Sequence, residues 1–173
     1  MFTLAPSVTH AAMLMSSKAT YVPAQKLIAT QAITLPNEHP STYALYIMTF
    51  TLTAFGNDVY LPTSLARSTG ALRENSTQFG IENGDRELFA GGFSAGLLTL
   101  ASSSPVDGYY LIKNGETKTV QVLVLYKNVS AHPDYYRMRI ANLAYRLGSV
   151  QGTWVNETNS VEKYKTEEVF LGR

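Results

Sequence analysis

The stretch Tyr43–Phe55 reads YALYIMTFTLTAF, and it decides the fold because apolar residues recur at every second position along it. Its even-numbered residues are apolar from Tyr46 to Ala54, whereas its odd-numbered residues are polar from Thr49 to Thr53. A period of two is that of a β-strand with one buried face. We therefore expect the even-numbered face of this strand to enter the core.

Two other stretches alternate in the same way, namely Lys118–Tyr126 (KTVQVLVLY) and Tyr135–Ile140 (YYRMRI). Shorter runs predict further strands near 26–35, 58–62, 78–82, 97–101, 108–112 and 161–171. After Ile140 the apolar residues change parity, which predicts a β-bulge near Ala141. Asn114-Gly115 lies between two strand-like runs and predicts a hairpin. Seven or more short strands separated by turns are typical of an antiparallel β-sandwich.

Three segments in this order resemble immunoglobulin-like modules of bacterial cell-surface proteins: Thr49–Pro62 (TFTLTAFGNDVYLP), Gly108–Tyr126 (GYYLIKNGETKTVQVLVLY) and Asp134–Tyr145 (DYYRMRIANLAY). Those uncharacterised modules often carry FTFxVTAxGxDIYIP, Y-x-I-x-x-G-E-T-x-T-F and G-x-YRVQL motifs. The present chain has Asp134-Tyr135-Tyr136 where they have glycine. The likeness spans about residues 43–147. It implies an all-β, immunoglobulin-like sandwich of about seven to nine strands at a cell surface, and it carries no catalytic residues.

The composition narrows the functional classes. The 173 residues are 45% hydrophobic but only 16% charged, the net charge is +1, and there is no cysteine. Disulfides and thiolate chemistry are excluded, and the lack of a Lys/Arg cluster argues against a nucleic-acid partner. No stretch approaches the ~20 apolar residues that a membrane span needs. Neutral polar side chains suit a surface that meets variable salt or contacts copies of itself.

No arrangement of residues predicts catalysis or a firm cofactor site. His10, His39 and His132 stand in the N-terminal arm or beside prolines, and no serine or aspartate motif accompanies them. We therefore expect no enzyme activity. Asn83, Asp85 and Glu87 offer oxygen atoms at alternate positions and form a weak candidate for calcium. Ordinary Asx-turns explain such residues more often, so no cofactor is expected.

The chain contains eleven tyrosines, and two adjacent pairs stand out. In Tyr109-Tyr110 and Tyr135-Tyr136 one member of each pair must point outward if the other is buried. Tyr109 and Tyr135 are therefore candidate contacts for a glycan or for a neighbouring subunit. We expect Trp154 to fill the core instead.

Three glycosylation sequons occur in segments expected to be loops. They begin at Asn75, Asn128 and Asn156. We treat these residues as candidate modification sites and as an indication that their segments are exposed.

Residues 1–25 are expected to form an arm before a sandwich over 26–173. The arm carries apolar residues that would be costly to leave in water, namely Phe2, Leu4, Val8, Met13 and Met15. Such an arm can add a strand to the sheet edge of a second copy. The expected function is that of a non-enzymatic, extracellular structural subunit that self-assembles into a filament, a pilus-like fibre or a surface layer. A carbohydrate- or cell-wall-binding module and a viral or phage coat protein remain alternatives.

Overall fold

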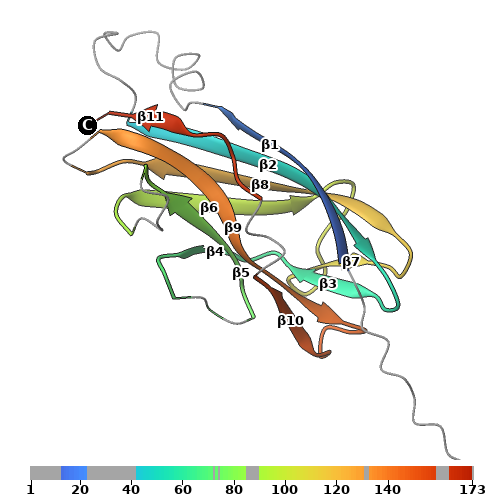
Figure 1. Cartoon of the computed structure of the whole chain (residues 1–173). Coiled ribbons are helices and arrows are strands. Elements are labelled where there is room, and N and C mark those ends of the chain that lie inside the picture. Colours follow the sequence, from blue (N-terminus) through green and yellow to red (C-terminus); the bar gives the residue numbers. More distant parts are fainter. Residues whose placement is uncertain are drawn as a thin grey trace, which may run out of the picture.

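The computed structural model describes residues 13–22, 42–71, 73, 75–84, 90–130, 133–158 and 164–172. Within these residues the chain forms eleven β-strands in two sheets, and the sheets stack as a sandwich (Figure 1). The prediction of an all-β antiparallel sandwich is confirmed. No helix that could cross a membrane occurs among the residues that the structure describes.

The first sheet has four antiparallel strands in the order β1-β2-β8-β6. They are β1 (Met13–Val22), β2 (Tyr43–Ala54), β8 (Thr117–Lys127) and β6 (Phe93–Leu100). This is the A-B-E-D order of an immunoglobulin sheet. Strands β1 and β6 therefore form its two edges.

The second sheet is built around the long strand β9 (Asp134–Leu147). Four short strands pair with β9, namely β3 (Val59–Pro62), β5 (Thr77–Glu82), β10 (Trp154–Glu157) and β11 (Val169–Leu171). Strand β4 (Leu65–Ser68) pairs with β5 in parallel, and β7 (Tyr109–Ile112) pairs with β3. The strand number exceeds the predicted seven to nine because four separate short strands pair with different parts of β9.

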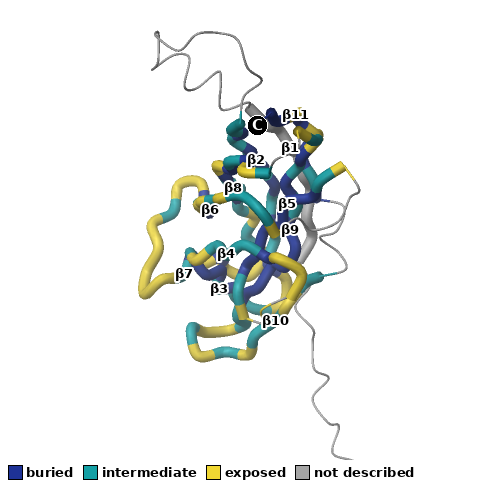
Figure 2. Tube along the Cα trace, turned by 90° about the vertical axis from the view of Figure 1, so that its left-hand side faces the viewer, coloured by how far each residue is buried: buried dark blue, intermediate teal, exposed yellow. Residues whose placement is uncertain are grey.

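The core lies between the sheets and is formed by the alternating residues that the sequence indicated. In β2 every even-numbered residue from Ala44 to Ala54 is buried. Figure 2 shows buried residues concentrated along β5 and β9, with exposed residues mainly in the loops. All six residues predicted for the inter-sheet core are buried, namely Phe50, Leu52, Val122, Val124, Met138 and Ile140.

The predicted bulge in β9 is also confirmed. Gln78 faces Asn142 and Phe79 faces Ile140, so Ala141 has no residue opposite it in β5. The extra residue changes the parity of β9, and residues 140–145 are consecutively buried. The bulge thus lets one strand direct side chains into the core on both sides of it.

The Asn114-Gly115 turn is present, but the predicted hairpin is wrong. Gly115 has a φ of +80°, and the Glu116 amide donates to the Lys113 carbonyl at 2.8 Å. The flanking strands do not pair with each other, because β7 joins β3 whereas β8 joins β2 and β6. The turn therefore carries the chain from one sheet to the other.

Part of the predicted arm is the edge strand β1. It pairs with β2 over its whole length, from Met13 opposite Ala54 to Val22 opposite Leu45. Met13 and Met15 of the predicted arm thus lie in a strand of the sandwich. The arm residues Phe2, Leu4 and Val8, and the strand predicted at 26–35, lie outside the described residues.

Candidate functional site

The two candidate tyrosines lie at opposite ends of the sandwich. Tyr109 begins β7, and Tyr135 lies at the start of β9, beside the C-terminal strand β11. Their neighbours Tyr110 and Tyr136 are buried, as the alternation predicts. Figure 1 shows β3, β7 and β10 at one end of the sandwich, and β11 with the C-terminus at the other end. The structure therefore does not combine the two tyrosines into one site.

Tyr109 instead joins a cluster that the sequence did not reveal. Tyr60 and Trp154 both lie directly opposite Arg146, on either side of it in neighbouring strands. The Arg146 guanidinium carbon is 4.5 Å from the centre of the Trp154 ring and 5.8 Å from that of Tyr109. The rings of Tyr109 and Trp154 are 6.3 Å apart. We call Tyr60, Tyr109, Arg146 and Trp154 the aromatic platform.

The aromatic platform faces outward. Its four members are partly exposed, whereas residues of opposite parity on the same strands, such as Leu61 and Tyr145, are buried. Val155 packs against the core next to Trp154. The prediction that Trp154 fills the core is therefore wrong, because the parity of β10 directs Val155 inward and Trp154 outward.

Arg146 lacks a charge partner in the part of the chain that the structure describes. None of the ion pairs or hydrogen bonds found there involves its guanidinium, and its buried Nε has no acceptor. Burial favours pairing of a cation, and a guanidinium offers five N–H donors. Stacking on the two rings stabilises the cation but leaves those in-plane donors available.

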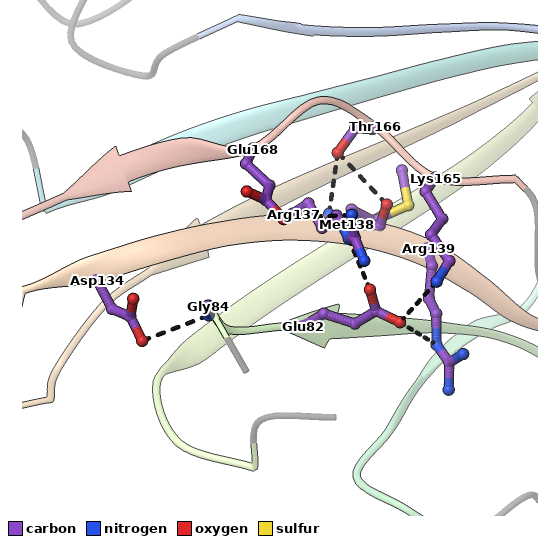
Figure 3. A network of polar contacts seen from close by, with 9 residues as sticks. All are labelled: Glu82, Gly84, Asp134, Arg137, Met138, Arg139, Lys165, Thr166 and Glu168. Atoms are coloured by element: carbon purple, nitrogen blue, oxygen red, sulfur yellow. Dashed lines mark hydrogen bonds and ion pairs between the residues drawn. The ribbon is translucent and has the colours of Figure 1, made fainter. Parts of the chain in front are cut away.

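A second cluster lies farther along β9, and its charged side chains form ion pairs with one another. The buried carboxylate of Glu82, at the end of β5, meets Arg137 Nε at 2.6 Å, Arg139 Nε at 3.2 Å and Lys165 Nζ at 3.2 Å. Arg137 also contacts Glu168 at 3.2 Å. Figure 3 shows these side chains converging from three segments. We call this cluster the Glu82 network.

The Glu82 network holds the C-terminal segment onto the sheet. Beside it, the amide of Met138 donates to Thr166 Oγ1 at 3.0 Å, and the amide of Thr166 donates to the Met138 carbonyl at 2.9 Å. The buried Glu82 carboxylate is paired with three cations from two other segments, so this arrangement suits a structural role. Alternating Arg137 and Arg139 in YYRMRI is a sequence signal that could have pointed to it, since cations spaced by two share one strand face, where an acidic residue of a neighbouring strand stabilises them.

Several tyrosines of the core are kept neutral. Burial raises the pKa of Tyr126, and burial together with the nearby Glu157 carboxylate raises that of Tyr145. The Tyr145 hydroxyl donates to Glu157 Oε1 at 3.2 Å. These phenols therefore act as hydrogen-bond donors in the core.

The outward face of the four-stranded sheet is apolar at one end. Two cross-strand rows run over β2, β8 and β6, the first through Leu45, Leu125 and Ala95 and the second through Ile47, Leu123 and Leu97. Leu97 is 56% exposed and Leu125 is 43% exposed, and the neighbouring Phe93 is 72% exposed. We call these two rows and Phe93 the apolar face.

The three sequons differ in accessibility. Asn75 is exposed in a loop, and its backbone amide donates to Asn156 Oδ1 at 3.0 Å. Asn156 is exposed but lies in β10, so the loop prediction is wrong there.

For Asn128 the predicted exposure is wrong. This residue is 2% exposed, and its amide donates to the Gly172 carbonyl at 2.9 Å. Its Oδ1 accepts from the amide of Ser130 and from the Tyr136 hydroxyl. Asn128 therefore fastens the C-terminal end of the chain and offers no free amide for modification.

The calcium candidate is only partly described. Asn83 follows β5, but Asp85 and Glu87 lie outside the described residues, as do His10, His39 and His132. Among the residues that are described, no group of three or more His, Asp or Glu side chains could hold a metal ion.

Comparison with known proteins identifies no family. No family model matches the chain, and no curated protein matches it. Among solved structures, a protein from Bordetella pertussis provisionally named ApaA aligns at 13% identity with a TM-score of 0.41 over 93% of each chain. A likeness of this degree carries no argument about function, and the fold assignment rests on the strand pairing itself.

Proposed function

We propose that this protein is a non-enzymatic structural subunit that assembles with copies of itself at a cell surface. The observation that carries the proposal is the combination of the apolar face and two sheet edges, β1 and β6, on one four-stranded sheet. An apolar sheet face next to an edge strand is a typical contact surface between proteins. The low charge of the chain and its resemblance to surface modules support the location.

A second copy is the occupant that fits this sheet best. The exposed large side chains of β6 and β8 on this face are apolar, namely Phe93, Leu97 and Leu125. They therefore complement a surface of the same kind. Edge strand β6 also presents backbone groups on the side away from β8. A neighbouring subunit can therefore bury apolar side chains and continue the sheet in one contact.

Strand β1 provides a route to a chain of subunits. It is the first strand described, and it pairs with β2 at the edge of the sheet. Residues 23–42 connect β1 to β2, and twenty residues can span up to about 70 Å when extended. That length allows β1 of one copy to pair with β2 of the next in the same register, which is strand exchange.

Electron microscopy and light scattering of the purified protein test the proposal. We expect ordered filaments or sheets from the full chain, and a folded, non-assembling protein after deletion of residues 1–22. A cooperative thermal transition of the truncated protein, at a temperature lowered by the loss of strand β1, would show that its sandwich still folds. Strict monomers at high concentration, or an assembly that survives the deletion, would contradict strand exchange.

A further inference from the structure

The aromatic platform lies on the opposite sheet from the apolar face, so assembly through the four-stranded sheet leaves it accessible. Three features of it call for an explanation. The guanidinium of Arg146 stacks on the rings of Trp154 and Tyr109, it has no hydrogen-bond or ion-pair partner among the described residues, and the outward Tyr60 lies opposite it in β3. None of these features is needed for the fold, because the inward residues of the same strands form the core.

We propose that the aromatic platform binds a saccharide that carries a carboxylate. The apolar face of a pyranose ring packs on an aromatic side chain, which Tyr60, Tyr109 and Trp154 provide beside the cation. A guanidinium pairs with a carboxylate through two parallel N–H···O bonds. One sugar unit can thus pack its ring on the aromatic side chains of the platform and pair its carboxylate with the guanidinium.

The charge of the platform favours a carboxylate over a phosphate. Arg146 is the only cation in this cluster, and a single guanidinium matches a monoanion. The whole chain has a net charge of +1 with no basic cluster, which gives a polyphosphate no extended cationic track.

Two kinds of sugar share this chemistry, uronic acids and sugars with a carboxyl-bearing ether such as muramic acid. A titration distinguishes them, with oligogalacturonate, N-acetylmuramic acid and a neutral cello-oligosaccharide as the probes. Trp154 is the single tryptophan of the chain, so its fluorescence reports directly on the aromatic platform. We expect a saturable change with at least one acidic probe, and affinity at least about tenfold weaker for the neutral one.

Variants then assign the binding to Arg146, with calorimetry as the readout. Arg146→Gln should reduce affinity for the acidic probe about tenfold or more, to the level of the neutral sugar. Arg146→Lys keeps the charge but loses the planar pair of donors. Its affinity for the acidic probe should lie between those of the unchanged protein and of Arg146→Gln. If the Gln variant melts early, the Lys variant decides, since it keeps a cation at the same position.

Two control variants exclude general effects of charge and of exposed tyrosine. Arg73→Gln removes an exposed cation outside the cluster, and Tyr135→Ala removes an exposed ring at the other end of the sandwich. Both should bind like the unchanged protein. Equal affinity for acidic and neutral sugars, no saturable response to any probe, or undiminished binding by both Arg146 variants would overturn the proposal.

Discussion

The two sheets enclose one core but differ sharply on their outward faces. The four-stranded sheet presents leucines and Phe93, whereas the seven-stranded sheet presents the Glu82 network and the aromatic platform. Alternation explains the buried side of β2 and β8 in the four-stranded sheet, whereas β5 and part of β9 in the other sheet are buried at consecutive residues. The difference shows that outward chemistry is set independently on each sheet, and we assign contact between copies to the first and ligand contact to the second.

Truncation of a side chain in the core between the two sheets should have the largest effect on stability. Phe50 is 2% exposed and its ring lies 5.9 Å from that of Tyr164. Phe50→Ala should lower the free energy of unfolding by about 3–5 kcal/mol, because the substitution leaves a cavity between the sheets. Urea denaturation measures this loss. A value below about 1 kcal/mol would mean that the two sheets do not share this core.

The second largest loss of stability is expected in the Glu82 network of the seven-stranded sheet. Glu82→Gln keeps the shape of the side chain but leaves Arg137, Arg139 and Lys165 without their shared anion. We expect a loss of about 3 kcal/mol in the free energy of unfolding.

Glu168→Gln is the matched control for Glu82→Gln. Its side chain is 37% exposed, so solvent screens its contact with Arg137 and the loss should stay within about 0.5 kcal/mol. Equal losses in the two variants, measured by the same denaturation, would show that burial of Glu82 is unimportant.

The turn that joins the sheets should give an intermediate effect. Gly115 has a φ of +80°, and a Cβ added there would meet no atom within 4 Å. Gly115→Val should therefore cost about 1–2 kcal/mol from backbone strain alone. Asn tolerates this conformation, so Gly115→Asn should cost less, and thermal melting of the two variants would reveal the order. Equal melting temperatures for Val and glycine at this position would rule out the strained turn.

The apolar face should give the smallest change in stability and a clear change in assembly. Leu97→Ser, at a residue that is 56% exposed, should alter the free energy of unfolding by no more than about 0.5 kcal/mol. Its neighbour Leu98 is 1% exposed, and Leu98→Ala should cost about 2–5 kcal/mol. Sedimentation velocity should show weaker self-association for Leu97→Ser, and unchanged association would remove this face from the contact.

Much of the fold could be predicted from the sequence because burial follows strand parity. The even face of Tyr43–Ala54 and the parity change near Ala141 both follow from the spacing of apolar residues alone. Strand partners do not follow from spacing. Asn114-Gly115 therefore suggested a hairpin, although the strands on either side belong to different sheets.

The candidate sites were harder to predict because they depend on register between distant segments. Trp154 meets Arg146 only through the pairing of β10 with β9, and Glu82 meets Lys165 across 83 residues of sequence. Asn128 looked exposed because its sequon is a local pattern, whereas its burial comes from Tyr136 and Gly172. The outward direction of Tyr109 could be predicted from its parity, whereas its contact with Arg146 could not.

Cross-linking between copies tests the central claim of strand exchange most directly. Ser16 of β1 lies opposite Thr51 of β2, and facing residues in antiparallel strands have Cα atoms about 4.5–5.5 Å apart, within reach of a disulfide. The chain has no cysteine, so Ser16→Cys and Thr51→Cys introduce the only thiols. The two single variants are refolded together at equal concentration, allowed to assemble and then oxidised.

Strand exchange predicts a covalent dimer that contains one copy of each variant, in excess over the dimers that either variant forms alone. The double variant within one chain serves as the control for a register that can close. If that control closes only within a single chain and the mixture yields no mixed dimer, β1 belongs permanently to its own sandwich, and assembly by strand exchange is contradicted.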